Sequence, residues 1–158
     1  MDKKEYERII KSYLDAVYRV ALVGCKNNSD AEDVVQNTFI KLWERKESFK
    51  DEDHLRRWLI RVAVNECRSL QRTPWKRKLL YIEDMTDEPK FSLPERSELF
   101  YAVMELDAKY RQVVLLYYFE DYNVREIAEI MKLSETAIQT RLLRARNKLK
   151  EVLKTEWE

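Results

Sequence analysis

The sequence predicts an all-α protein in which a flexible linker joins two small helical domains. Three observations predict this class. One Gly and three Pro occur in 158 residues, so few positions suit turns that need unusual backbone angles. Residues with high helix propensity abound, and apolar side chains recur at spacings of three and four. No strand-like alternation of apolar and polar residues interrupts this pattern.

The N-terminal part carries three stretches of helical periodicity, which predict helices over residues 6–25, 30–46 and 54–72. Ser29 and Glu32 have the spacing of a capping box, in which a hydroxyl and a carboxylate satisfy backbone donors at a helix start. The second helix is therefore expected to begin near Asp30, with Asn27 and Asn28 in the preceding loop. These three helices form the first predicted domain, residues 1–72.

Helical periodicity fades over residues 73–93. Prolines flank a basic run in this stretch and an acidic run follows, a composition that predicts a linker. Periodicity returns in four stretches and predicts helices over residues 95–105, 108–120, 124–131 and 135–155. Residues 94–158 are the second predicted domain.

The third predicted helix has one apolar side and one basic side. At 100° per residue the apolar side collects Leu55, Leu59, Val62 and Leu70. The opposite arc collects Arg57, Arg61, Asn65, Arg68 and Arg72, with Trp58 at its edge. Residues 54–78 hold eight basic side chains and one acidic side chain, a net +7. Two interpretations stay open, a solvated amphipathic face or a surface for unpaired nucleic acid, where arginines meet phosphates and Trp and Asn meet a base.

The last two predicted helices have the pattern of a helix-turn-helix. Asn123 and Glu126 have capping spacing, and Ser134 suits the cap of the following helix. Residues 134–154 hold six basic and two acidic side chains. An ordinary surface helix is the alternative to a groove-reading helix. The inward residues are Ile138, Leu142, Ala145 and Leu149, and the outward or flanking ones are Thr136, Gln139, Thr140, Arg141, Arg144, Arg146, Asn147 and Lys148.

Composition excludes several other classes of protein. The net charge of +1 indicates no particular partner, so the distribution of charge matters more than its sum. Cys25 and Cys67 lie in apolar helical patterns without metal-ligand spacing, which predicts buried free thiols and suits a reducing cytoplasm. No apolar run is long enough for a membrane span, and we expect neither membrane insertion nor secretion. No phosphate loop, metal cluster or catalytic pair appears, so neither a cofactor nor an enzymatic activity is expected.

Three segments together resemble the extracytoplasmic-function (ECF) group of the bacterial sigma-70 family of RNA polymerase sigma factors. They are DAEDVVQNTFIKLWE at 30–44, HLRRWLIRVAVNECRSLQR at 54–72 and VREIAEIMKLSETAIQTRLLRARNKLK at 124–150, in the family's order. The resemblance implies a sigma region 2 domain over 1–72, a linker over 73–93 and a region 4 helix-turn-helix over 94–158. It further implies a cytoplasmic protein that binds core RNA polymerase and directs promoter recognition and transcription initiation, and an anti-sigma factor as a regulatory partner.

The resemblance also implies roles for individual residues. Core polymerase binding falls to Asp33, Gln36, Asn37, Ile40 and Trp43. Binding of the minus-ten element falls to Phe49, Arg57, Trp58, Arg61, Asn65, Arg68 and Arg72, where Phe49, Trp58, Asn65 and the loop at 50–53 form a pocket for a flipped base. Recognition of the minus-thirty-five element falls to Thr136, Ala137, Gln139, Thr140, Arg141, Arg144, Arg146 and Lys148.

Two rival functions remain. A helix-turn-helix transcription regulator would use the N-terminal domain as a ligand sensor, although a sensor favours an apolar pocket over a basic stripe. A nuclease would need a catalytic constellation, and the single His54 lies beside basic residues without a recognisable catalytic partner.

Overall fold

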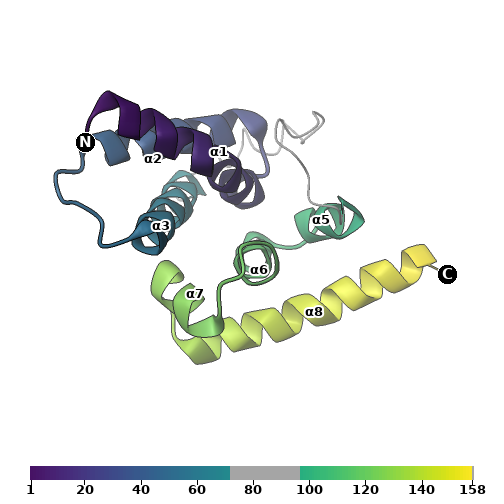
Figure 1. Cartoon of the computed structure of the whole chain (residues 1–158). Coiled ribbons are helices and arrows are strands. Elements are labelled where there is room, and N and C mark those ends of the chain that lie inside the picture. Colours follow the sequence, from purple (N-terminus) through teal and green to yellow (C-terminus); the bar gives the residue numbers. More distant parts are fainter. Residues whose placement is uncertain (72–96, 158) are drawn as a thin grey trace. The chain divides into compact units, whose positions relative to one another are not determined.

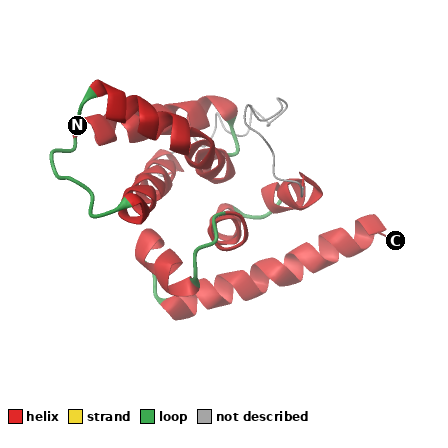
Figure 2. Cartoon of the chain, viewed as in Figure 1, coloured by secondary structure: helices red, strands yellow, loops and turns green. Residues whose placement is uncertain are grey.

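The computed structural model describes residues 1–71 and 97–157, and all regular elements in these ranges are helices (Figure 2). The described helices form two separate compact units, the first with α1–α3 and the second with α5–α8. The predicted all-α, two-domain class is therefore confirmed. The predicted linker and Arg72 lie outside the described residues. The helices are α1 (Lys3–Cys25), α2 (Asn28–Glu44), α3 (Glu52–Gln71), α5 (Ser97–Met104), α6 (Ala108–Val114), α7 (Val124–Met131) and α8 (Glu135–Trp157), and α6 continues into the π-helix η1 (Leu115–Phe119).

The first turn of α2 differs from the predicted one. Its N-cap is Asn27, whose side chain accepts a hydrogen bond from the Asp30 amide at 2.9 Å, and Ser29 lies inside the helix. The predicted capping box of Ser29 and Glu32 is therefore wrong. Lys26 ends α1 in the left-handed conformation, and this leaves Asn27 extended and placed to cap the next helix.

In the first unit α1, α2 and α3 pack against one another around one core (Figure 1). The buried side of α3 includes Leu55 and Leu59, as predicted, but Val62 and Leu70 are only half-buried. α3 contacts α1 and α2 at the same time, so its buried arc is wider than one amphipathic stripe and is turned away from Val62. The residues on this added part of the arc are Ile60, Ala63, Val64 and Cys67.

In the second unit α5, α6 and α7 pack against the long helix α8 (Figure 1). The inward face of α8 is as predicted, with Ile138, Leu142 and Ala145 fully buried and Leu149 nearly so. The helix predicted over 108–120 changes type at Leu115, where a π turn takes over and the Glu120 amide bonds the Leu115 carbonyl at 3.0 Å. No helix within the described ranges is both long and apolar enough to cross a bilayer.

The helix-turn-helix has the predicted caps. Asn123 and Glu126 form a complete capping box at the start of α7. α7 ends at Lys132, which is in the left-handed conformation, and the Ser134 hydroxyl accepts a hydrogen bond from the Ala137 amide at 3.1 Å. These local bonds fix the turn between α7 and α8, and they hold the outward face of α8 in a defined orientation to α7.

Candidate functional sites

An aromatic cluster lies where the loop after α2 meets α3. The Phe49 ring packs edge-on against Trp58, with ring centroids 5.5 Å apart, and against His54 at 5.3 Å. The Arg45 guanidinium lies over both rings, 4.4 Å from the Phe49 centroid and 5.1 Å from the Trp58 centroid. The structure thus brings the predicted pair Phe49 and Trp58 together. The sequence reasoning missed Arg45, because no periodicity indicates where a loop residue points.

Hydrogen bonds to the backbone hold this loop. Asp51 caps α3 by accepting a bond from the His54 amide at 2.7 Å, and His54 Nδ1 accepts a bond from the Lys50 amide at 3.0 Å. The helix therefore begins at Glu52, two residues earlier than predicted. The single histidine has a structural role here, since it joins the loop to the first turn of α3.

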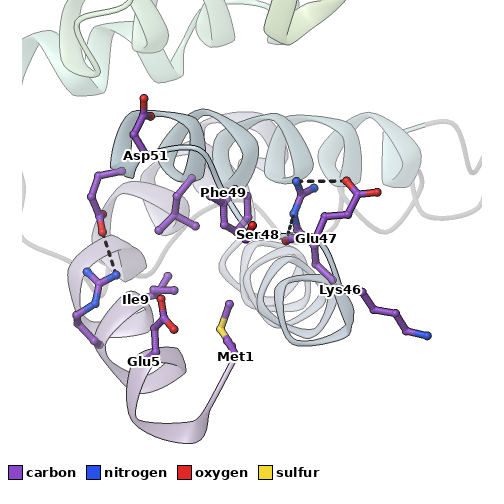
Figure 3. Close-up of a pocket in the computed structure, with 12 residues that line it drawn as sticks. Met1, Glu5, Ile9, Lys46, Glu47, Ser48, Phe49 and Asp51 are labelled. Atoms are coloured by element: carbon purple, nitrogen blue, oxygen red, sulfur yellow. Dashed lines mark hydrogen bonds and ion pairs between the residues drawn. The ribbon is translucent and has the colours of Figure 1, made fainter.

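A cavity of about 440 Å³ lies between the start of α1, the same loop and the start of α3. Figure 3 shows Met1 and, on α1, Glu5 and Ile9 on the side of the cavity opposite the loop segment that carries Phe49. Its floor is apolar, since Ile9 and Leu55 are buried, and its rim is charged. Of the residues predicted for a base pocket, three line this cavity, namely Phe49, Asp51 and Glu52, whereas Trp58 and Asn65 are not among its lining residues.

Glu52 lies at the rim of this cavity and binds two partners from α1. Arg8 forms an ion pair with it at 2.9 Å, and the Tyr13 hydroxyl donates a hydrogen bond to it at 2.5 Å. Burial, together with the hydrogen bond to Glu52, raises the pKa of Tyr13 to about 12. The same bond lowers the pKa of Glu52, with Arg8 adding to the effect. The carboxylate is therefore ionised and the phenol neutral at physiological pH.

The basic side of α3 is only partly exposed to solvent. Arg61 is exposed, whereas Arg57, Asn65 and Arg68 are half-buried. Arg57 forms an ion pair with Asp53 at 2.8 Å, one turn earlier on the same helix. Asn65 follows Trp58 by two helical turns, on the same side of α3 and roughly 10 Å further along its axis. Phe49, Trp58 and Asn65 thus face a common side of the unit without forming one closed pocket.

The outward face of α2 carries the five residues predicted to bind polymerase, and all of them are exposed. Ile40 and Trp43 each keep 51% of their surface open to solvent, a high value for large apolar side chains. The Trp43 ring packs edge-on against Tyr6 of α1 at 4.9 Å. The five residues, which we call the α2 face, are Asp33, Gln36, Asn37, Ile40 and Trp43.

Glu66 connects the α2 face to α3. Its carboxylate forms an ion pair with Lys41 and accepts a hydrogen bond from the side-chain amide of Asn37 at 3.5 Å. Both partners belong to α2, so the one acidic side chain of the basic segment predicted at 54–78 points toward α2. Glu66 therefore reduces the positive potential on the outer side of α3 by less than the net charge of the segment indicates.

The outward face of α8 carries the predicted groove-reading residues. Thr136, Gln139, Thr140 and Arg144 are exposed, while Ala137 and Arg141 are half-buried. Arg146 and Lys148 are exposed on the flanks, and Lys148 lies near Asp107 at 3.9 Å and over the Tyr110 ring at 4.8 Å. Leu143 is 57% exposed in the middle of this face. The sequence reasoning missed it, because an apolar residue is normally assigned to the core.

Both units match families of known proteins. A family model described as Sigma-70 region 2 matches residues 9–77, and one described as Sigma-70, region 4 matches residues 96–149. The RNA polymerase sigma factor SigV of Bacillus subtilis is 30% identical over 132 residues, which cover 81% of this chain and 78% of SigV. The chain belongs to the sigma-70 family.

Further relatives place this sigma factor in the ECF group. The ECF RNA polymerase sigma factor SigM of Bacillus subtilis is 29% identical, covering 91% of this chain and 92% of SigM. The crystallised sigma factor RpoE from Bartonella quintana, in complex with the anti-sigma factor NepR, has a TM-score of 0.78 at 26% identity, covering 96% of this chain and 98% of RpoE. The N-terminal unit is thus region 2, and the rival regulator with a sensor domain is set aside.

Proposed function

We propose that the three exposed faces of this sigma factor divide its work. The α2 face binds core RNA polymerase, the aromatic cluster and the basic side of α3 hold the melted minus-ten strand, and the outward face of α8 reads the minus-thirty-five element. The observation that carries the proposal is the exposure of Ile40 and Trp43 on the otherwise polar outward face of α2. Two large apolar side chains left open beside polar ones have the character of interface anchors.

The region around Phe49 suits an unpaired base. Flipping a base out of a duplex costs about a few kcal/mol, and stacking on an aromatic ring returns about 1–3 kcal/mol per base. Phe49 and Trp58 offer rings, and the cavity beside Phe49 has about 440 Å³ of space. Asn65 offers an amide edge two turns further along α3. Arg57, Arg61, Arg68 and Arg72 are assigned to the adjacent phosphates.

The outward face of α8 suits an intact major groove. An exposed guanidinium such as that of Arg144 can donate two hydrogen bonds to a guanine edge, and the amide of Gln139 can pair with an adenine edge. The hydroxyls of Thr136 and Thr140 and the flanking Arg141, Arg146 and Lys148 are assigned to nearby bases and phosphates. Ala137 lets the helix approach the groove closely.

Domain boundaries of 1–72, 73–93 and 94–158 are part of the same proposal, as is a cytoplasmic location beside the polymerase. We assign no catalytic step of transcription to the chain. It stabilises the open promoter by two DNA contacts held on one polymerase, and this sharing raises the effective concentration of the second contact. An anti-sigma factor is the proposed regulator, by analogy with the RpoE complex with NepR.

The test is reconstitution with bacterial core polymerase and a library of random promoters. We expect the transcribed sequences to share two short elements, one near minus ten and one near minus thirty-five. Transcripts without a common sequence, or the same transcripts with and without the chain, would reject the proposal.

A further inference from the structure

The two cysteines lie next to each other across the interface of α1 and α3. The Sγ atoms of Cys25 and Cys67 are 3.7 Å apart, neither cysteine is in a disulfide, and the residues are 5% and 0% exposed. We propose that this pair is a modification site, at which a hydroperoxide oxidises the two thiols to an intrachain disulfide. The proposal concerns region 2 by itself and does not depend on polymerase or DNA.

The geometry needs little change for the bond to form. A disulfide joins its sulfurs at about 2.05 Å, so the two Sγ atoms must approach by roughly 1.7 Å. Each cysteine has a single side-chain torsion that moves its sulfur. The Cys67 sulfur also lies 3.7 Å from the Ala21 carbonyl oxygen, a contact that keeps the thiol on the side of α3 that faces α1.

The positions of the two residues set the order of events. Cys25 is the last residue of α1, and the chain leaves the helix at Lys26 in the left-handed conformation. Helix ends open more readily than helix centres, so Cys25 meets the oxidant first. Cys67 lies four residues before the end of α3 and is fully covered. Cys25 is thus the reacting thiol and Cys67 the resolving thiol.

The chemistry balances with one hydrogen peroxide. The Cys25 thiolate attacks one peroxide oxygen, the O–O bond breaks, and sulfenic acid and hydroxide result. The Cys67 thiolate then attacks the Cys25 sulfur, the S–S bond forms, and the leaving hydroxide takes up a proton. The protons released by the two thiols convert both hydroxides to water. Two thiols are oxidised, and one peroxide is reduced to two waters.

The bond would enclose residues 25–67 in a covalent ring. This ring contains all of α2 and the loop that carries Phe49, and it ties the end of α1 to α3. Because the crosslink restricts the unfolded chain, we expect the melting temperature of region 2 to rise by at least about 5 °C on oxidation.

The experiment treats the folded full-length protein with hydrogen peroxide in the presence of dimedone, which traps sulfenic acid, and identifies the products by peptide mass spectrometry. The wild type should lose two hydrogens, yield a Cys25–Cys67 crosslinked peptide and carry little dimedone. Cys67→Ser should carry at least about tenfold more dimedone on Cys25, because the resolving thiol is gone. Cys25→Ser should leave Cys67 unmodified, because that thiol is buried.

Three outcomes would overturn the proposal. They are wild-type thiols that react only after denaturation, disulfides only between chains, and equal dimedone labelling in the wild type and Cys67→Ser. The wild-type crosslink is measured without any variant, so a serine variant that fails to fold does not remove the test. The melting temperature of the oxidised and reduced wild type gives a second readout.

Discussion

The Arg45 guanidinium lies 4.4 Å from the centre of the Phe49 ring and also covers Trp58. Its Nε donates a hydrogen bond to the Glu47 carbonyl oxygen at 3.1 Å, so the arginine is anchored to the loop that it stabilises. One side chain thus orders both rings of the aromatic cluster. Arg45 and Phe49 lie between α2 and α3, and Trp58 lies on α3, so the three side chains meet only in the folded chain. The packing of the two rings therefore depends on the tertiary structure.

The first prediction concerns this cluster. Arg45→Ala should lower the free energy of unfolding of region 2 by about 1 kcal/mol, the size of a partly exposed cation–π contact. Arg45→Lys should lose less, because it keeps the charge. Urea unfolding followed by tryptophan fluorescence measures the difference, with Lys46→Ala as the exposed neighbouring control. Equal stability of Arg45→Ala and the control would contradict this role of Arg45.

The second prediction separates DNA opening from polymerase binding. Asn65→Ala should reduce promoter opening about tenfold, because the amide that bonds the flipped base is lost. Affinity for core polymerase should stay within about twofold, since Asn65 lies on α3 away from the α2 face. Permanganate footprinting measures opening, and a polymerase binding assay measures affinity. Parallel loss of both would show that Asn65 does not act at the melted strand.

The third prediction concerns the outward face of α8. Arg144→Ala should lower transcription from the intact promoter about tenfold, the cost of losing one bidentate base contact. It should also remove the preference of the polymerase holoenzyme for the base pair that Arg144 contacts. Lys150→Ala, at an exposed position of the same helix, is the matched control. An unchanged ranking of promoters with single substitutions in the minus-thirty-five element would reject the assignment.

The fourth prediction follows from the bond between Tyr13 and Glu52. Since the folded state lowers the pKa of Glu52, its ionised form stabilises the fold, and that contribution is present at neutral pH and lost as pH falls below about 4. Glu52→Gln should therefore be slightly less stable than the wild type at pH 7. The difference in stability between the wild type and Glu52→Gln should be smaller at pH 3.5. The midpoints of urea unfolding at both pH values measure this difference.

The matched control for that experiment is Glu7→Gln on the exposed side of α1. It should show no comparable dependence on pH. A stability gap between the wild type and Glu52→Gln that stays constant from pH 7 to pH 3.5 would mean that the carboxylate charge contributes nothing.

The sequence was sufficient for the class of fold, the order of helices and the caps of the helix-turn-helix, because these depend on local periodicity and short-range hydrogen bonds. It was insufficient for the buried side of α3. Val62 follows the amphipathic stripe yet is half-buried, since α3 packs on two helices at once. The start of α2 also differed, because Asn27 is as good a cap as Ser29 and only the path out of α1 decides between them.

Candidate sites on helices were easier to predict than those that involve loops. The exposure of Arg144 was predicted from helical spacing, and that of Ile40 and Trp43 from the family resemblance. By contrast, Arg45 and the cavity beside Phe49 depend on how the loop folds over the ends of α1 and α3. Leu143 was missed for another reason. Its apolar side chain predicts a buried position, but it is exposed on α8.

The proposed function depends most on docking of the α2 face to core polymerase, and binding measured by fluorescence anisotropy tests this docking directly. A labelled chain titrated with polymerase that lacks its own sigma subunit should bind saturably and be displaced by unlabelled chain. Trp43→Ser should weaken this binding at least about tenfold, while the exposed Lys11→Ser on α1 should leave it unchanged. Absence of saturable binding by the wild-type chain would contradict the account.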